Sequence, residues 1–230
     1  MPEVGIELYK VINVSGADAS EFLQGQLTQD VSLLATEPRL LAAWCTAKGR
    51  VIVLARLASI DGGIAMVVPA DMADKVLQTL LMYRFRSRVD LAVSDNDGGE
   101  WLEPQESDPL SLIQAGIPHI DLLNSEAFTP HMLNLDKLGA ISFTKGCYTG
   151  QEIVARTEHR GKSKRRMMHY LADSEGISVG ATVSDGDRSA GEVVNVAGTE
   201  LLAVTPVDRH AEPLRVGDIV IRPQGLPYRL

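Results

Sequence analysis

The residues best suited to chemistry lie in one octapeptide, KGCYTGQE, at positions 145–152. It contains Cys147, one of only two cysteines in the chain. Thr149 and Glu152 have the spacing of a helix capping box, so we expect a helix to begin here. A thiol just outside the N-terminal end of a helix meets unpaired backbone N–H groups, which favour its thiolate. The ammonium of Lys145 would add to this effect if it reached the sulfur.

The same cysteine could instead be a small apolar residue buried in a turn, as free cysteines usually are. Gly146 and Gly150 bracket Cys147 and predict a tight turn, and the polar residues around it favour exposure. Replacing Cys147 with Ala should abolish activity with little loss of fold, whereas extensive unfolding would support the buried alternative. Cys45 follows Trp44 in an apolar stretch, where we expect it in the core.

The bulk composition narrows the class of protein. The chain has 230 residues, 45% of them hydrophobic, which is enough for one large domain or for two or three lobes. A net charge of −8 gives no overall attraction to nucleic acid or to an anionic membrane. The start of the sequence has no signal-peptide pattern, and the longest apolar runs are far too short to span a bilayer. We therefore expect a cytoplasmic protein with free thiols and no membrane partner.

A basic run follows the octapeptide, with one negative residue, Glu158, inside it. Its positive residues are Arg156, Arg160, Lys162, Lys164, Arg165 and Arg166. Such a patch on an acidic protein predicts local binding of an anion, although a solvated basic loop is an equally good interpretation. No aromatic residue alternates with these cations, which argues against a surface for single-stranded nucleic acid.

Metal and nucleotide motifs are missing from the sequence. The five histidines show no H-x-x-x-H spacing and the cysteines no C-x-x-C, so we expect no metal site. There is also no Walker loop and no G-x-G-x-x-G. Cys147 and His159 could meet as a nucleophile and base, but the sequence offers only weak support for that pair.

The predicted elements give an α+β fold. Strands are expected at 6–14, 40–46, 51–60, 64–68 and 87–93, with helices after Ser15 and after Asp71. This order predicts an N-terminal α+β lobe at 1–94 with a largely antiparallel sheet. The polar end of the first helix, residues 24–30, is expected to be solvated. Residues 95–166 form a middle lobe rich in Pro, Asp and Asn, and short alternating strands predict a small β-barrel at 167–230.

The octapeptide and its flanks, residues 140–156, resemble the K-G-C-Y-x-G-Q-E signature of the YgfZ family. These are folate-binding proteins implicated in making or repairing iron–sulfur clusters. The resemblance recurs in order at 16–19, 22–30, 48–52, 83–89, 116–118 and 130–135. It implies the multi-lobed ring of the glycine-cleavage aminomethyltransferase, with antiparallel sheets and a C-terminal barrel around a channel for tetrahydrofolate.

The resemblance also implies roles for particular residues. Cys147 and Lys145 would be catalytic, and the anionic tail of the folate would meet the basic run. The folate contacts would come from Gln114, Tyr148, Gln151, Glu152 and Arg156. At 112 and 114, Leu and Gln stand where relatives often have Arg and a pterin-binding Glu, and Gln cannot form the charge-assisted pair of a carboxylate. Another reduced pterin could therefore be the ligand.

Three functions follow, and each has a discriminating observation. The leading hypothesis is a tetrahydrofolate-binding accessory protein for iron–sulfur proteins or their assembly factors, acting through Cys147. A folate-dependent one-carbon transferase is the second, although Val53 and Leu54 occupy the positions of the transferase's aspartate pair. The third is a non-catalytic scaffold that docks an acidic protein or RNA through the basic run 156–166. It would be insensitive to Cys147→Ala and sensitive to charge reversal at Arg165 and Arg166.

Overall fold

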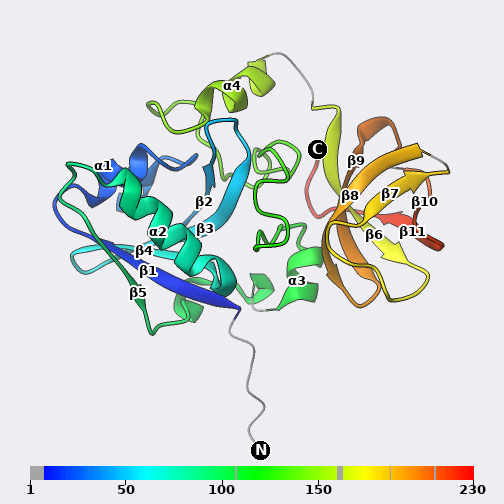
Figure 1. Cartoon of the computed structure of the whole chain (residues 1–230), viewed down its shortest axis with the longest axis horizontal. Helices are drawn as coiled ribbons and strands as arrows, with labels where there is room; N and C mark the ends of the chain where they lie inside the picture. The colour runs from blue at the N-terminus through cyan, green and yellow to red at the C-terminus, as the bar shows by residue number, and fades with distance from the viewer. Residues whose placement is uncertain (1–7, 107, 160–162, 187, 210) are drawn as a thin grey trace, which may run out of the picture.

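A computed structural model describes residues 8–106, 108–159, 163–186, 188–209 and 211–230. Two β units lie side by side and are joined by a largely irregular middle segment (Figure 1). Arg160 and Lys162 of the basic run, and the start of the first predicted strand, lie outside the described residues. No helix in the described ranges combines the length and the apolar character needed to cross a membrane.

The N-terminal unit is a five-stranded antiparallel sheet in the order β2-β3-β4-β1-β5. Its strands are β1 (Tyr9–Ser15), β2 (Leu40–Cys45), β3 (Val51–Ile60), β4 (Gly63–Pro69) and β5 (Asp90–Ser94). Helices α1 (Ala19–Gln24) and α2 (Ala73–Tyr83) cover one face. Because side chains alternate along a strand, Val53 and Leu57 face these helices, whereas Leu54 packs toward the middle segment.

Short helices punctuate the middle segment and the connections. They are η1 (Val31–Ala35), η2 (Ala70–Met72), η3 (Gly99–Trp101), η4 (Pro104–Glu106), α3 (Pro109–Gln114), α4 (Gln151–His159) and η5 (Val207–Arg209). Helix α3 is capped at its start, because Asp108 accepts a hydrogen bond from the Ser111 amide at 2.9 Å and Pro109 follows the cap. Figure 1 places α3 and α4 at opposite ends of this segment.

The C-terminal unit confirms the predicted barrel. Six strands close in the order β10-β11-β6-β9-β8-β7. They are β6 (Arg165–Ala172), β7 (Thr182–Asp185), β8 (Arg188–Ala197), β9 (Glu200–Pro206), β10 (Leu214–Val216) and β11 (Ile219–Gln224). A single apolar cluster joins Leu54 of the sheet, Phe128 and Val154 of the middle segment and Leu202 of the barrel. The middle segment therefore packs against both β units.

Candidate functional site

Cys147 is exposed, and Cys45 is fully buried. The expectation of an exposed thiol in the octapeptide is confirmed, and the buried alternative for Cys147 is wrong. Burial raises the pKa of the Cys45 thiol to about 12, so Cys45 is an inert core residue. Cys147 lies in the loop before α4 and is thus accessible to a partner.

Helix α4 begins at Gln151, as predicted, but the predicted capping box does not form. The Thr149 amide donates to the Gly25 carbonyl at 3.3 Å, and the Thr149 hydroxyl donates to the Gln26 side chain at 3.4 Å. Glu152 instead accepts a hydrogen bond from Arg156 at 2.8 Å, one turn along the helix. Thr149 therefore ties the loop to the end of α1 rather than capping α4.

Lys145 holds the loop from inside the protein. Its residue is only 9% exposed, and its ammonium donates to the carbonyls of Gln24, Leu27 and Gln29 at 2.7, 2.7 and 3.0 Å. An ammonium has three hydrogens, so these bonds use all of them. Burial lowers the pKa of Lys145 to about 8, while Asp30 acts in the opposite direction. The predicted role beside the sulfur remains a prediction, and these three bonds argue against it.

The polar residues after α1 are anchors for the loop, so the expectation that they form a solvated helix end is wrong. Thr28 is fully buried; its hydroxyl donates to the Ala140 carbonyl at 2.6 Å and accepts from the Ala43 amide at 2.9 Å. The Gln29 side chain donates to the Gly139 carbonyl. The signal in the sequence was a run of amide and hydroxyl side chains, two of which, Thr28 and Gln29, donate to carbonyls more than a hundred positions away.

Two glycines let the octapeptide pack against the β2–β3 turn. Gly150 has φ +84°, and a Cβ there would lie 2.4 Å from the Thr46 carbonyl oxygen. Gly49 has φ +68°, and a Cβ there would lie 2.8 Å from the Ile153 Cβ. By contrast, a Cβ on Gly146 would meet nothing within 4 Å. Gly150 is therefore required by close packing, and Gly146 is not.

The folate contacts implied by the resemblance fall into two groups that the structure does not bring together. Tyr148, Gln151, Glu152 and Arg156 lie on or just before α4. Tyr148 is buried below the Lys145 ammonium, 5.2 Å from its ring centroid, and burial raises the pKa of its hydroxyl. Gln114 lies on α3 at the other end of the segment (Figure 1), where it donates to Glu200 at 2.9 Å.

The basic run does not form one patch in the described residues. Arg166 is 9% exposed and makes a two-pronged ion pair with Asp136, with the second contact at 3.0 Å. Burial acts to raise the pKa of Asp136, but the hydrogen bond and charge of Arg166 outweigh it and lower that pKa. Arg165 donates to the Ala190 carbonyl at 3.0 Å. The expectation that Arg166 belongs to an anion-binding surface is therefore wrong, whereas Lys164 is exposed.

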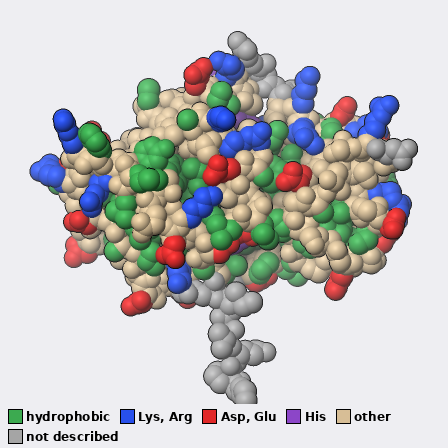
Figure 2. Space-filling model, viewed as in Figure 1, with side chains coloured by type: hydrophobic (Ala, Val, Ile, Leu, Met, Phe, Trp, Pro, Cys, Tyr) green, Lys and Arg blue, Asp and Glu red, His purple; other side chains and the backbone are tan. Residues whose placement is uncertain are grey.

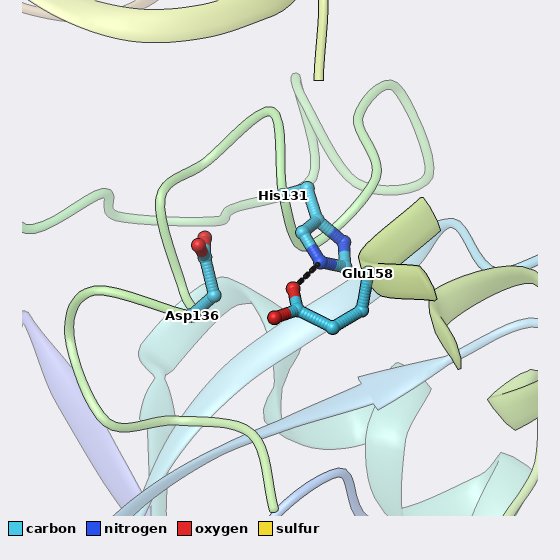
Figure 3. Close-up of side chains that lie close together, drawn as sticks. All are labelled: His131, Asp136 and Glu158. Carbon is cyan, nitrogen blue, oxygen red and sulfur yellow. Dashed lines mark hydrogen bonds and ion pairs between the residues drawn. The ribbon is translucent and has the colours of Figure 1, made fainter. Parts of the chain in front are cut away.

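One group of possible metal ligands lies beside α4: His131, Asp136 and Glu158, whose candidate ligand atoms lie within 4.8 Å of one another. In Figure 3, the His131 ring meets the Glu158 carboxylate, at 3.1 Å, with Asp136 to one side. Both Asp136 oxygens already bind the Arg166 guanidinium, whose positive charge opposes a cation there. The group's evident contribution is to fasten the end of α4.

His159 lies at that same end of α4, roughly 12 Å along the helix from its start. This distance separates His159 from the Cys147 loop and argues against the pair of nucleophile and base.

A second polar cluster, which the sequence analysis missed, lies on the sheet face toward the middle segment. Arg56, 2% exposed, donates from Nε to Glu106 at 2.7 Å. Its guanidinium lies 5.1 Å from the Tyr9 ring centroid, and that ring meets His119 edge-on at 5.5 Å. A lone arginine in the otherwise apolar stretch VIVLARLA was the available signal. We name Tyr9, Arg56, Glu106 and His119 the central cluster.

Several polar atoms of the central cluster have no hydrogen-bond partner among the described residues. They are Nη1 and Nη2 of Arg56, the Tyr9 hydroxyl and Nδ1 of His119. Burial lowers the pKa of His119, and the Arg56 charge lowers it further, so the ring is neutral near pH 7. A buried polar group without a partner costs about 1–3 kcal/mol. The cluster is therefore suited to a ligand, or to water, that offers both acceptors and donors.

Two cavities adjoin the central cluster. One, of about 170 Å³, is lined by Arg39, Arg56 and Glu106, among others. The other, of about 210 Å³, is lined by Pro109 and Leu112 of α3, by His119 and by Asn195 of the barrel. The Asn195 side chain donates to the His119 carbonyl at 2.8 Å and accepts from the His119 amide at 2.9 Å. The second cavity thus lies where the middle segment meets the barrel.

Comparison with known proteins assigns the family. No family model matches the sequence. The tRNA-modifying protein YgfZ of Klebsiella pneumoniae (strain 342) is 30% identical over 298 aligned positions, which cover 96% of this chain and 91% of that relative. The chain belongs to the YgfZ family. The YgfZ protein of Escherichia coli O139:H28 (strain E24377A / ETEC) is also 30% identical, over 85% of this chain and 79% of its own.

The aminomethyltransferase-like fold is confirmed as well. The glycine cleavage system aminomethyltransferase T from Bartonella henselae superposes with a TM-score of 0.71 over 95% of this chain and 83% of its own, at 16% identity. At that identity the likeness establishes the fold alone. This YgfZ-family chain therefore combines the transferase architecture with an exposed thiol.

Proposed function

We propose that this chain is a tetrahydrofolate-binding accessory protein in the synthesis or repair of iron–sulfur proteins, with Cys147 as its working group. One observation carries the proposal: an exposed thiol on a loop that buried bonds hold in place. A loop held by Lys145, Thr28 and Thr149 keeps the sulfur at one position without covering it. That is what a thiol needs if it is to meet a partner protein repeatedly in the same geometry.

The central cluster is the part of the chain that fits the folate. A pterin has ring nitrogens and a keto oxygen that accept hydrogen bonds, and N–H groups that donate them. His119 is the member of the central cluster that lines the cavity beside α3, and its neutral ring offers Nδ1 as donor or acceptor. We place the pterin in the cavity between His119 and Leu112, beside the helix that carries Gln114. Tetrahydrofolate, when bound, supplies a reduced pterin that can carry a one-carbon unit.

The separation of the two sites shapes the mechanism. Because α3 and α4 lie at opposite ends of the middle segment, we assign separate tasks to the pterin pocket and to the Cys147 loop (Figure 1). His119 would bind and orient the pterin. Tyr9 packs edge-on against the His119 ring and Arg56 lies over Tyr9, so these two residues, which do not line this cavity, would hold the His119 ring in place. Cys147 would act outward, on an iron–sulfur protein or an assembly factor in the cytoplasm. The relatives are named tRNA-modifying proteins, so we propose to test whether tRNA modification requires this chain.

The one-carbon transferase is the weaker proposal. The positions that match the transferase's aspartate pair are Val53 and Leu54, both fully buried and apolar. Neither can accept a proton or orient a cationic carrier. Release of formaldehyde equivalents from methylenetetrahydrofolate to a series of amines, catalysed by the purified chain, would revive this proposal.

The test of Cys147 is genetic and biochemical. Cells that lack the chain receive the wild type, Cys147→Ala, or Thr144→Ala as a control that alters an exposed residue of the same loop. We expect Thr144→Ala to restore both the activity of iron–sulfur enzymes and tRNA modification, and Cys147→Ala to restore neither while accumulating as folded protein. Full restoration by Cys147→Ala would remove the thiol from the proposal.

A further inference from the structure

A second exposed feature lies beside the Cys147 loop. It is the turn Tyr83–Arg88, with the sequence YRFRSR, which begins at the last residue of α2. Phe85 is 87% exposed and Tyr83 is 48% exposed. Single exposed apolar residues are common, but two aromatics that alternate with three arginines are not explained by chance exposure. The proposed function does not use this turn.

The turn is held rigidly while Phe85 stays outside. The Arg88 amide and guanidinium both bind Asp18, at 2.8 and 3.0 Å, and the Ser87 amide donates to the Arg84 carbonyl at 2.8 Å. Phe85 has φ +40°, a conformation that an aromatic residue rarely adopts. The surrounding bonds thus hold a strained backbone that projects the Phe85 ring into solvent, a combination that often marks a functional position.

The three arginines are not equivalent. Arg88 pairs with Asp18, and Arg84 lies 4.0 Å from Asp90. Arg86 has no acidic partner among the residues that the structure describes, and its guanidinium lies 5.7 Å from the Phe85 ring centroid. Phe85 and Arg86 therefore form one unit, an aromatic face beside a cation that is not neutralised by an ion pair.

Hollows flank this unit, and one of them extends to residues that contact the Cys147 loop. One, of about 430 Å³, is lined by Tyr83, Arg86, Gly25 and Gln26, among others, and the other, of about 400 Å³, by Arg84 and Arg88. The walls of the first continue into the octapeptide, because Gly25 and Gln26 are the residues that bind Thr149. Figure 2 shows basic and hydrophobic side chains together at this edge of the N-terminal unit.

We propose that the turn Tyr83–Arg88 binds an unpaired nucleobase of a single-stranded nucleic acid, with the base stacked on Phe85 and a phosphate at Arg86. Aromatic faces with an adjacent arginine bind bases of any sequence, and the cation meets the backbone. The expectation against nucleic acid rested on the net charge of −8 and on the run 156–166, which has no aromatics. In the turn Tyr83–Arg88, aromatics alternate with the cations. The carboxylates of Glu21 and Asp90 also line the hollows, and their negative charge limits the number of phosphates that can bind there.

The test is fluorescence anisotropy of labelled hexamers, A6 RNA and dA6 DNA, with the full chain. Phe85→Ala and Phe85→Leu should each weaken binding about tenfold, which corresponds to about 1.4 kcal/mol, and Phe85→Tyr should retain it. Leu123→Ala and Arg188→Ala alter exposed residues elsewhere and should change nothing. With one phosphate contact, the slope of log affinity against log salt should be about −0.7, and Arg86→Ala should flatten it. Tighter binding of the RNA than of the DNA would identify RNA as the source of the base.

Three results would overturn the proposal. Absence of binding by the wild type at high micromolar protein would do so directly. Binding that survives Phe85→Ala and falls steeply with salt would assign the nucleic acid to the basic run instead. If Phe85→Leu binds the hexamers as the wild type does, the base does not stack on the Phe85 ring and the proposal is wrong. None of these results depends on folate binding or on Cys147.

Discussion

Replacement of Lys145 by Met tests the most specific claim about the Cys147 loop. The change removes three hydrogen bonds from a charged donor to the carbonyls of Gln24, Leu27 and Gln29. Such bonds contribute about 1.5–3 kcal/mol each. Removing the ammonium also removes the free-energy cost of burying a charge. The lowering of the Lys145 pKa from 10.5 to about 8 corresponds to a cost of roughly 3 kcal/mol. The difference leaves an expected destabilisation of about 3 kcal/mol at pH 7.

The assay is urea denaturation of the variant and the wild type, with the reactivity of Cys147 toward a chromogenic disulfide followed in parallel. A loss of about 3 kcal/mol lowers the midpoint by about 1 M urea for a chain of this size. Lys75→Met is the matched control, because Lys75 makes a surface ion pair with Glu126 at 3.3 Å and should contribute less than about 1 kcal/mol. An unchanged midpoint together with a much slower thiol reaction would refute the reasoning. It would support the predicted effect of the Lys145 ammonium on the Cys147 sulfur instead.

Three further predictions concern the same loop. The pKa of Lys145 is about 8 in the folded chain and 10.5 ordinarily, so between these pH values the unfolded chain binds more protons than the folded chain. The unfolding free energy of the wild type, measured in urea, should therefore rise with pH relative to that of Lys145→Met, by up to about 3 kcal/mol. Gly150→Ala should lower the unfolding free energy by more than about 2 kcal/mol, since its Cβ would lie 2.4 Å from a backbone oxygen. Gly176 is also at positive φ, but a Cβ there would meet nothing within 4 Å, so Gly176→Ala should lower the unfolding free energy less in the same urea denaturation. Mass spectrometry after brief alkylation of the native chain should find Cys147 modified and Cys45 intact, and labelling of both would mean that the core opens readily.

The β units and the exposure of Cys147 were largely predictable from the sequence. A nearly continuous apolar run such as 51–60 predicts a strand that is buried on both faces, and Gly and Asp clusters mark the turns between strands. The barrel followed from short strands split by Gly, Asp and Pro. The octapeptide located the exposed thiol because its residues are polar around Cys147 and its glycines predict a turn.

Contacts between distant parts of the chain could not be predicted. Local pattern does not reveal that Lys145 reaches back to residues 24–29, or that Arg166 pairs with Asp136 inside the protein. Both side chains were interpreted from charge and neighbourhood, which favour the surface. The central cluster was missed for the same reason, since Arg56 and His119 are unremarkable until the fold brings them together.

The measurement that most directly tests the central claim is a calorimetric titration of tetrahydrofolate into the chain under anaerobic, reducing conditions. We predict saturable one-to-one binding by the wild type and by Cys147→Ala, and a large loss of affinity in His119→Ala, whose Nδ1 has no partner in the described structure. Gln114→Ala should lose less, because Gln114 is engaged with Glu200. Absence of binding by the wild type at millimolar folate would contradict the account and leave Cys147 as a thiol that works without this cofactor.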